Sequence, residues 1–412
     1  MSGIVRSSRT ELSAVLGATF LVRFAFGITT AVFATYLTGL AQGPAPVDYG
    51  TVGLVTAMAS IAEAATVLGS GMLADRRGRW PVLAGGMVLS AAATAGFALD
   101  RSPLWLGALN FLFGIGSGAI LTASLAVVAD GTPTGRRGHE MGRFDAMNLA
   151  GWVVGFAVGY AALTFVAPGR LFAVFGIGTV GIVAGLAYAR SGFRGRSTHA
   201  VGSGPLGLTA LRRPEVLAVT LPWAVIYMLL GTALVFLAVS AQGVGIPPID
   251  LAVGIGAGGL LLTVTQPAYG RLVDRFGTTA LLLVGTGGFV LVLVGAALLA
   301  SLPLGWPSVV VLAVGAVGAL AYGPAAFAAL ADLSAQITRA TTMAITTLFI
   351  SLGMTAGLLG STQLYARFGT AGIDLFFGIL AAALALLAIV RVRQAPLGRP
   401  PVGPLPPTIP AR

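Results

Sequence analysis

The chain has 412 residues, of which 56% are hydrophobic and only 9% charged. A soluble domain carries about 25% charged residues, so this composition excludes a soluble globular protein and predicts an integral membrane protein. The chain has two histidines and no cysteine, which excludes disulfides and thiolate metal sites. We therefore expect neither a metal nor a cofactor.

All 24 basic residues are arginines, and the formal net charge is +11. Such a charge is compatible with nucleic-acid binding, but arginines that anchor cytoplasmic loops of a membrane protein explain it better. If the N-terminus is cytoplasmic, 20 of the 24 arginines lie on the cytoplasmic side of the expected topology. This bias predicts that both termini are cytoplasmic, and the Arg-, Ala- and Gly-rich composition points to a bacterial inner membrane. No nucleic-acid partner is expected.

Apolar stretches of the length that a spanning helix needs, about 20 residues, occur twelve times along the chain. The first stretch is too long for a cleaved signal peptide, so we expect it to remain as a helix. The expected spans are residues 12–40, 50–74, 81–99, 104–129, 142–166, 170–189, 215–241, 251–272, 279–300, 305–330, 343–366 and 372–391.

Two charged residues lie well inside the first two spans, Arg23 and Glu63. A charge at the centre of a spanning helix costs at least about 2.5–3.5 kcal/mol on insertion scales, so such residues are rare and often functional. At about 1.5 Å per residue both lie roughly 17 Å from the cytoplasmic end, near the midplane where carriers bind substrate and ions. Either the two side chains simply pair, or Glu63 exchanges a proton while Arg23 tunes it or contacts an anionic group.

The loop between spans 2 and 3 concentrates charge in the sequence GMLADRRGRW, residues 71–80. A related sequence, GRLVDRFG, returns at 270–277, which is 199 residues later. The dipeptide Ala-Asp at 129–130 returns at 331–332, an offset of 202. Matches at nearly one offset, close to half the chain length, predict a six-helix unit duplicated in the same orientation.

This duplication divides the chain into two bundles and two polar segments. We expect an N-terminal six-helix bundle over residues 1–189 and a C-terminal six-helix bundle over residues 214–391. Residues 190–213, rich in Arg, Gly and Ser, are expected to form a cytoplasmic linker. The Pro-rich residues 392–412 are expected to be a disordered tail.

Twelve spans, the duplication and the motif GMLADRRGR resemble the major facilitator superfamily over roughly residues 12–391, and in particular its bacterial drug and metabolite efflux branch. The resemblance implies an all-α membrane fold of twelve transmembrane helices in two pseudo-symmetric six-helix bundles, with spans 1, 4, 7 and 10 around a central cavity. It also implies alternating access, with the loop motif as a conformational latch. Asp75 would cap the start of span 11 in the other half, and Arg79 would bridge Asp75 and Asp130.

The chemistry of such a latch is reasonable, because a carboxylate at a helix N-terminus gains about 0.3–1 kcal/mol. The alternative is a plain solvated loop. The second copy has Thr278 where Arg79 would stand, so the second latch is expected to be weaker. The expected latch residues are Gly71, Asp75, Arg76, Gly78, Arg79, Asp130, Asp274 and Arg275.

Other polar positions bear on the expected substrate and proton-coupling site. Span 4 has Asn110 where the family has an arginine, and span 5 keeps only the glycines at 151, 155 and 159 of the antiporter signature, which also suit close helix packing. Asp145 and Asn148 lie near the cytoplasmic end of span 5 and are expected to face water. The expected substrate and coupling residues are Arg23, Glu63, Asn110, Tyr227, Gln266 and Tyr322, each of the last four being as suited to packing as to binding.

These observations predict a monomeric secondary transporter that moves a small organic molecule, with protons and the lipid bilayer as its other partners. Proton-coupled efflux by antiport is the first interpretation, and a proton symporter or facilitator that imports a small metabolite is the alternative. A membrane-embedded enzyme is a third possibility. The two histidines, the missing cysteines and the lack of an acidic metal cluster in the sequence argue against it, so we expect no enzymatic activity.

Overall fold

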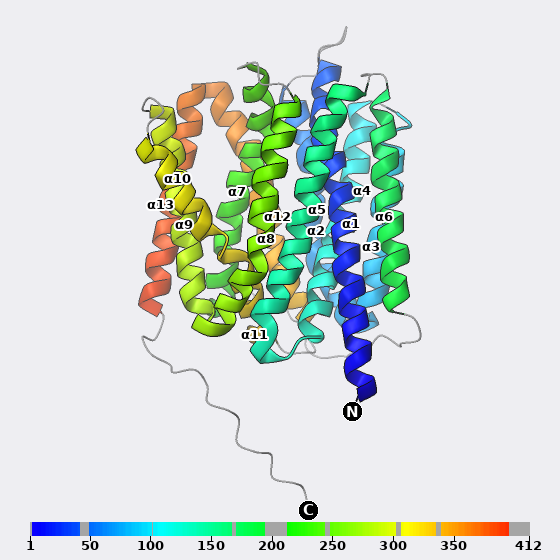
Figure 1. Ribbon diagram of the computed structural model, residues 1–412. Helices are drawn as coiled ribbons and strands as arrows, with labels where there is room; N and C mark the ends of the chain where they lie inside the picture. The colour runs from blue at the N-terminus through cyan, green and yellow to red at the C-terminus, as the bar shows by residue number, and fades with distance from the viewer. Residues whose placement is uncertain are drawn as a thin grey trace, which may run out of the picture.

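The computed structural model describes residues 2–41, 49–100, 102–166, 170–193, 212–243, 248–301, 306–334 and 339–394. In these ranges the chain is helical and contains no strand. The helices run side by side along one direction, and the start of α1 and the end of α13 lie at the same end of the bundle (Figure 1). The first half contains α1 Ser2–Ala41, α2 Tyr49–Arg77, α3 Arg79–Gly96, α4 Pro103–Asp130, the short 3-10 helix η1 Thr134–Arg136, α5 Arg137–Phe165 and α6 Phe172–Gly192. The second half contains α7 Pro214–Gly243, α8 Pro248–Phe276, α9 Thr278–Ser301, α10 Trp306–Ala319, α11 Tyr322–Leu333, α12 Arg339–Phe368 and α13 Thr370–Gln394.

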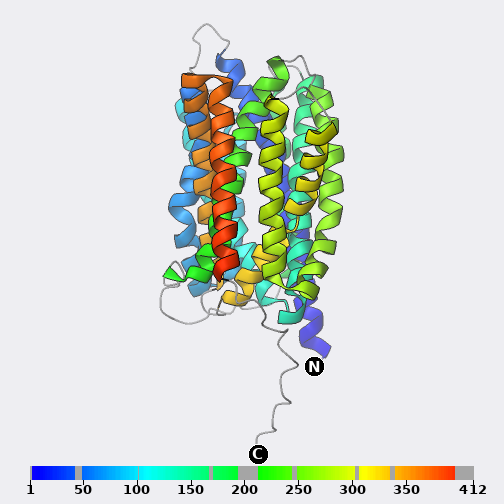
Figure 2. The same ribbon diagram turned by 90° about the vertical axis from the view of Figure 1, so that its left-hand side faces the viewer.

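This architecture confirms the expected all-α membrane fold. Within the described ranges, nine helical stretches are long and apolar enough to cross a membrane. The side-by-side arrangement of the helices is also seen after a turn of 90° (Figure 2). Many large apolar side chains, such as Val180 and Leu261, remain exposed, as they would toward lipid. The chain is therefore a multi-pass membrane protein. The proposed linker falls mostly on residues 194–211 and the proposed tail on residues 395–412, both outside the described residues.

The tenth expected span, residues 305–330, is two helices rather than one. Helix α10 ends at Ala319 and α11 begins at Tyr322. Pro324 has no backbone N–H for the carbonyl of Leu320, and its ring crowds that carbonyl, so the helix breaks one turn before the proline. The break places Tyr322 and Gly323 at the start of a new helix, deep inside the bundle.

Packing within each half repeats with the duplication. Helix α5 lies against α1, where a Cβ added to Gly151 would come 2.5 Å from the carbonyl oxygen of Phe20. Helix α12 lies in the same way against α7, where a Cβ on Gly353 would collide with the backbone of Ala224. Gly151 and Gly353 are 202 residues apart, so the duplicated glycines form equivalent close helix contacts in both halves.

A second pair of close contacts joins the halves to each other. Helix α2 packs against α12, where a Cβ on Gly71 would lie 2.9 Å from the carbonyl oxygen of Ala340. Helix α8 packs against α5, where a Cβ on Gly270 would collide with the carbonyl oxygen of Gly138. Both contacts lie near the end of the bundle where α2 and α8 end and α5 and α12 begin, which we call the latch end.

Candidate functional site

Asp75, near the C-terminus of α2, contacts the first turn of α12 in the opposite half. Its Oδ1 accepts a hydrogen bond from Ala340 N at 3.1 Å, and its Oδ2 accepts bonds from Thr341 N at 2.9 Å and Thr341 Oγ1 at 2.6 Å. The carboxylate is 6% exposed, so these bonds form largely away from water. Asp75 thereby satisfies backbone donors that a helix N-terminus leaves free and adds a favourable interaction with the helix dipole.

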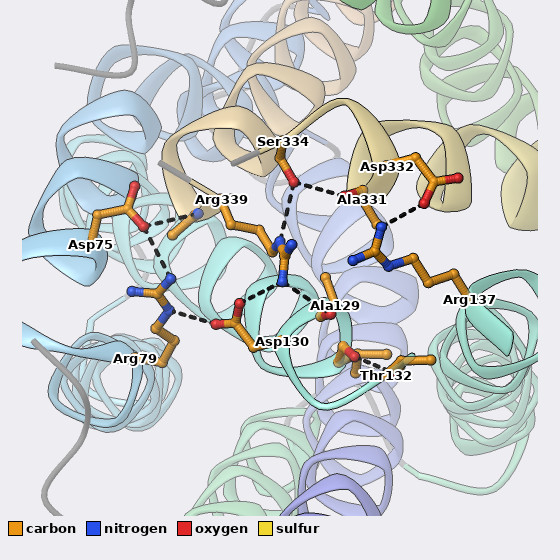
Figure 3. Close-up of polar contacts among 12 residues, drawn as sticks. Asp75, Arg79, Ala129, Asp130, Thr132, Arg137, Ala331, Asp332, Ser334 and Arg339 are labelled. Atoms are coloured by element: carbon orange, nitrogen blue, oxygen red, sulfur yellow. Dashed lines mark hydrogen bonds and ion pairs between the residues drawn. The ribbon is translucent and has the colours of Figure 1, made fainter. Parts of the chain in front are cut away.

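Arg79 joins this contact to α4, as Figure 3 shows. Its guanidinium lies 3.2 Å from Asp75 Oδ1 and 3.1 Å from Asp130 Oδ2, and it also donates to the carbonyl oxygen of Ala74 at 3.0 Å. A sharp turn brings Arg79 into position, because Gly78 adopts a φ of +96°, which favours glycine. Asp75, Arg79 and Asp130 thus lie together at the latch end.

Arg339 is a further member of this group that the sequence analysis did not assign. Its Nη1 lies 2.7 Å from Asp130 Oδ1 and also donates to Ala129 O at 3.2 Å, while its Nε donates to Ser334 Oγ at 3.2 Å (Figure 3). Asp130, from the first half, therefore binds one arginine from each half. The signal that could have identified Arg339 is its place 202 residues after Arg137, the same offset that relates the two Ala-Asp dipeptides.

The second copy of the motif forms the equivalent contact with α5. Asp274 Oδ1 accepts a bond from Gly138 N and Oδ2 one from His139 N, both at 2.9 Å. Arg137 pairs with Asp332 across the halves, as Arg339 pairs with Asp130. The Asp332 side chain is 42% exposed and that of Asp130 is 32% exposed, and Thr278 supplies no arginine. The contact around Asp274 therefore has fewer charged partners and is more exposed to solvent than the contact around Asp75.

The remaining expected latch residues differ in their surroundings. Gly71 allows α2 and α12 to approach closely, as described above. Arg76 is exposed at the surface. The Arg275 guanidinium lies 5.2 Å from the ring centroid of Phe276, beside it on α8. The structure does not bring Arg76 or Arg275 into the group of Asp75, Arg79 and Asp130.

Arg23 lies in the interior of the bundle, 5% exposed. Its guanidinium carbon lies 5.4 Å from the ring centroid of Phe26 and 6.0 Å from that of Trp152 on α5. Within the part of the chain that the structure describes, the guanidinium makes no hydrogen bond and no ion pair within 4.0 Å. Arg23 and Glu63 interact electrostatically without a direct ion pair among the described residues.

Glu63, half-buried on α2, lies between α4 and α12. Its Cγ would be 3.0 Å from a Cβ on Gly118, which shows how closely α4 approaches. The hydroxyl of Ser351, on α12, lies within hydrogen-bonding reach of the carboxylate. Glu63 therefore contacts the opposite half as well as its own.

Tyr227 and Gln266 come from the second half. Tyr227 is half-buried, and its ring centroid is 5.7 Å from that of Trp223. It also lies within electrostatic reach of Arg23, Glu63 and Asp145. Gln266 is 2% exposed, and its Oε1 has no hydrogen-bond partner among the described residues; the same holds for the indole nitrogen of Trp223. Arg23, Glu63 and Tyr227 thus form a central polar group.

Two of the expected binding residues, Asn110 and Tyr322, form hydrogen bonds to the backbone of neighbouring helices. Asn110 Nδ2 donates to the backbone oxygens of Val55 at 2.9 Å and Thr56 at 3.1 Å, and so ties α4 to α2. The Tyr322 hydroxyl donates to Val219 O at 2.7 Å, and its ring packs against Trp223. Both side chains thus use their polar atoms on backbone oxygens of neighbouring helices, α2 for Asn110 and α7 for Tyr322, and sequence spacing does not identify these acceptors.

Asp145 does not face water as expected. It is half-buried on α5, and a Cβ added to Gly323 of α11 would collide with its Oδ2. Asn148 lies within hydrogen-bonding reach of the carboxylate. The break before Pro324 places Gly323 against α5, which explains why the position of Asp145 could not be inferred from its distance to the end of the span.

The described residues contain no group of three or more His, Cys, Asp or Glu side chains that could hold a metal ion. In general, a guanidinium can bind an anion and a carboxylate can exchange a proton, and the described interior contains both kinds of group.

Comparisons with known proteins bear on the family and the fold of this chain. The model of the Major Facilitator Superfamily matches residues 15–334 and 241–410. A niacin transporter of Acinetobacter baylyi is 32% identical over 116 residues, which is 28% of this chain and 26% of that protein. A 4-hydroxybenzoate transporter of Pseudomonas aeruginosa is 30% identical over 167 residues, 40% of this chain and 35% of that protein. The chain thus matches only about a quarter to a third of the length of these relatives.

The fold is similar to that of a proton:xylose symporter whose structure has been solved with a bound bromodeoxyglucose. That comparison has a TM-score of 0.74 at 16% identity and covers 94% of this chain and 97% of the symporter. At this identity the likeness shows the fold alone. None of these three names specifies efflux or antiport, so the comparisons do not support the efflux interpretation.

Proposed function

Because the chain belongs to the Major Facilitator Superfamily, we propose that it takes up a small aromatic carboxylic acid together with a proton, by alternating access of its two halves. The observation that carries this proposal is the buried guanidinium of Arg23, which has no hydrogen-bond or ion-pair partner among the described residues. This uptake is the alternative that the sequence left open, and it replaces efflux as the main interpretation.

An arginine in this setting is suited to binding a carboxylate. A buried charge without a partner is costly, and a guanidinium binds a carboxylate through two parallel hydrogen bonds. The rings of Phe26 and Trp152 beside Arg23 would contact a planar aromatic group. The names of the two relatives agree with this substrate class, since niacin and 4-hydroxybenzoate are both aromatic carboxylic acids.

Glu63 provides a route to proton coupling. Glu63 and a bound carboxylate would compete for the positive charge of Arg23, since Arg23 and Glu63 already interact electrostatically. Binding of the acid would therefore favour protonated Glu63. A loaded carrier would hold one acid and one proton, which is the stoichiometry of symport.

The test is transport of radiolabelled 4-hydroxybenzoate and nicotinate in proteoliposomes. We expect accumulation when the outside is acidic, and no uptake of the neutral amide nicotinamide. Arg23→Gln should weaken binding roughly 10- to 100-fold, because a hydrogen bond to a charged group contributes about 1.5–3 kcal/mol. Arg170→Gln, which removes an exposed arginine at the opposite end, is the matched control and should change nothing.

Glu63→Gln separates binding from coupling in the same assay. We expect this variant to exchange labelled for unlabelled acid across the membrane but to lose accumulation driven by the pH gradient. Accumulation only with the gradient of opposite sign would show efflux and overturn the proposal. Unchanged pH-driven uptake by Glu63→Gln would exclude Glu63 as the coupling residue.

A further inference from the structure

Asp145 is a buried acidic residue that the proposed function does not use. It lies on α5, between the latch end of that helix, where Gly138 contacts Asp274, and Trp152, which contacts Arg23. Its carboxylate is directed at Gly323 of α11, so that it lies at the contact between the two halves. When the halves separate at the latch end, this contact must separate with them.

The charged groups around Asp145 are already engaged with other partners. On α5, Arg143 binds Glu140 at 2.9 Å, and Arg136 of η1 lies 3.8 Å from the same carboxylate. On α8, Asp274 accepts the bonds from α5 described above, and on α11 Asp332 binds Arg137. On α4, Asp130 binds Arg79 and Arg339.

The groups nearer to Asp145 do not include a cation that pairs with it. Tyr227 of α7 interacts with it electrostatically, and Arg23 of α1 interacts with Glu63 and Tyr227. His139 lies earlier on α5, and its Nδ1 has no partner among the described residues. In the described part of the chain Asp145 has no ion pair, and its near polar neighbour is Asn148, whose Oδ1 also lacks a partner.

An ionised carboxylate is poorly accommodated in such a contact. Closing the halves would remove water from the charge without supplying a cation, whereas a neutral carboxylic acid costs much less to enclose. Asn148 can also accept a hydrogen bond from a protonated carboxyl through its unpartnered Oδ1. Closure and protonation of this residue are therefore linked.

We propose that Asp145 is a second proton-binding residue of the transport cycle, whose protonation favours closure of the latch end and whose ionisation favours its opening. The proposal rests on the proposed function only in that the two halves must move apart at this end. It assigns to Asp145 a conformational role that is separate from substrate binding at Arg23 and from proton exchange at Glu63.

The chain has no cysteine, so pairs of spin labels can be introduced directly. We would place labels at R77C and F276C, which are exposed positions at the ends of α2 and α8 and lie 199 residues apart. In nanodiscs without substrate, we expect the label distance to be short in acidic buffer and to lengthen in alkaline buffer. Asp145→Asn should keep the short distance at every pH.

Three variants make this measurement specific. Asp145→Glu should retain the pH-dependent lengthening, which also shows that the position tolerates substitution. Glu63→Gln should retain it too, because that residue is assigned to coupling rather than closure. Asp100→Asn removes an exposed carboxylate in the loop before α4 and should behave as the wild type. The proposal is overturned if the label distance in Asp145→Asn increases with pH as it does in the wild type. It is also overturned if the label distance in the wild type does not change with pH.

This result is independent of the substrate proposal. If the labelled chain responds to pH through Asp145 but transports no aromatic acid, the substrate assignment is wrong and the role of Asp145 stands. If the chain transports 4-hydroxybenzoate and Asp145→Asn still responds to pH, the substrate assignment stands and the role of Asp145 is rejected.

Discussion

Asp75 and Asp274 occupy equivalent positions in the duplicated sequence, and each accepts two backbone hydrogen bonds from a helix of the opposite half. Their surroundings nevertheless differ. Asp75 also accepts a hydrogen bond from the Thr341 hydroxyl and forms an ion pair with Arg79. The residue is 6% exposed. Asp274 is exposed. Burial strengthens charged hydrogen bonds because less water competes for them, so the first carboxylate should contribute more to closure.

Matched neutralisation tests this difference. We expect Asp75→Asn to destabilise the closed latch end by about 1–3 kcal/mol, since it removes the ion pair and one charged acceptor. Asp274→Asn should destabilise the closed latch end less, because water can more readily replace the hydrogen bonds that Asp274 accepts. The labels at R77C and F276C would report both as a change in the closed population. An equal effect of the two substitutions would contradict the importance of burial and of Arg79.

At the scale of helices, glycines make two kinds of contact. Gly155 and Gly151 hold α5 against α1 within one half, so we expect these helices to stay together when the halves move. Gly71 and Gly270 allow helices of different halves to approach, and these must separate when the latch end opens. The same residue type should therefore affect folding stability in one place and conformational balance in the other.

Three alanine substitutions distinguish these roles. Gly155→Ala places a methyl group against the backbone of Phe24 and should lower the unfolding midpoint, because overpacking costs about 1–3 kcal/mol. Gly270→Ala should leave that midpoint nearly unchanged and shift the label distance toward the open state. Gly254→Ala is the control, because Gly254 lies on α8 with Gly270 but a Cβ added there meets no atom within 4 Å. Tryptophan fluorescence during heating measures the first effect, and a low midpoint for Gly270→Ala would contradict this division.

At the scale of the molecule, the two halves are held together by the reciprocal pairs α2–α12 and α5–α8. The ion pairs cross in both directions, with Arg339 bound to Asp130 and Arg137 bound to Asp332. These contacts do not require the segment between Gly192 and Pro214 to be continuous. The covalent link between the halves should therefore be dispensable once the chain has folded.

Cleavage of a protease site inserted between Gly192 and Pro214 tests this expectation. We expect the two fragments to elute together in detergent and to retain uptake in proteoliposomes. A site inserted between Arg77 and Arg79 is the control, because its cleavage should disrupt the turn that places Arg79 on Asp75 and Asp130. Separation of the fragments after the first cut would show that the non-covalent contacts are insufficient.

The sequence by itself determined the membrane fold, because each span is local and its apolar length is set by the thickness of the bilayer. It also determined the duplication, since GMLADRRG and GRLVDRFG repeat within one chain. The buried charges of Arg23 and Glu63 could be located for the same reason, as a charge within an apolar stretch is visible without any knowledge of its neighbours. The break before Pro324, by contrast, was not part of the expected tenth span and appeared only in the structure.

Only the tertiary structure decided which groups meet. The family resemblance placed Asp75 at the start of span 11, but the ion pair of Arg339 with Asp130 and the bond from the Thr341 hydroxyl to Asp75 appeared only in the structure. It likewise directed Asn110 to the backbone of α2, and Asp145 to Gly323 rather than to water. Helical periodicity gives the face on which a side chain lies, but the neighbour on that face depends on how the two halves pack.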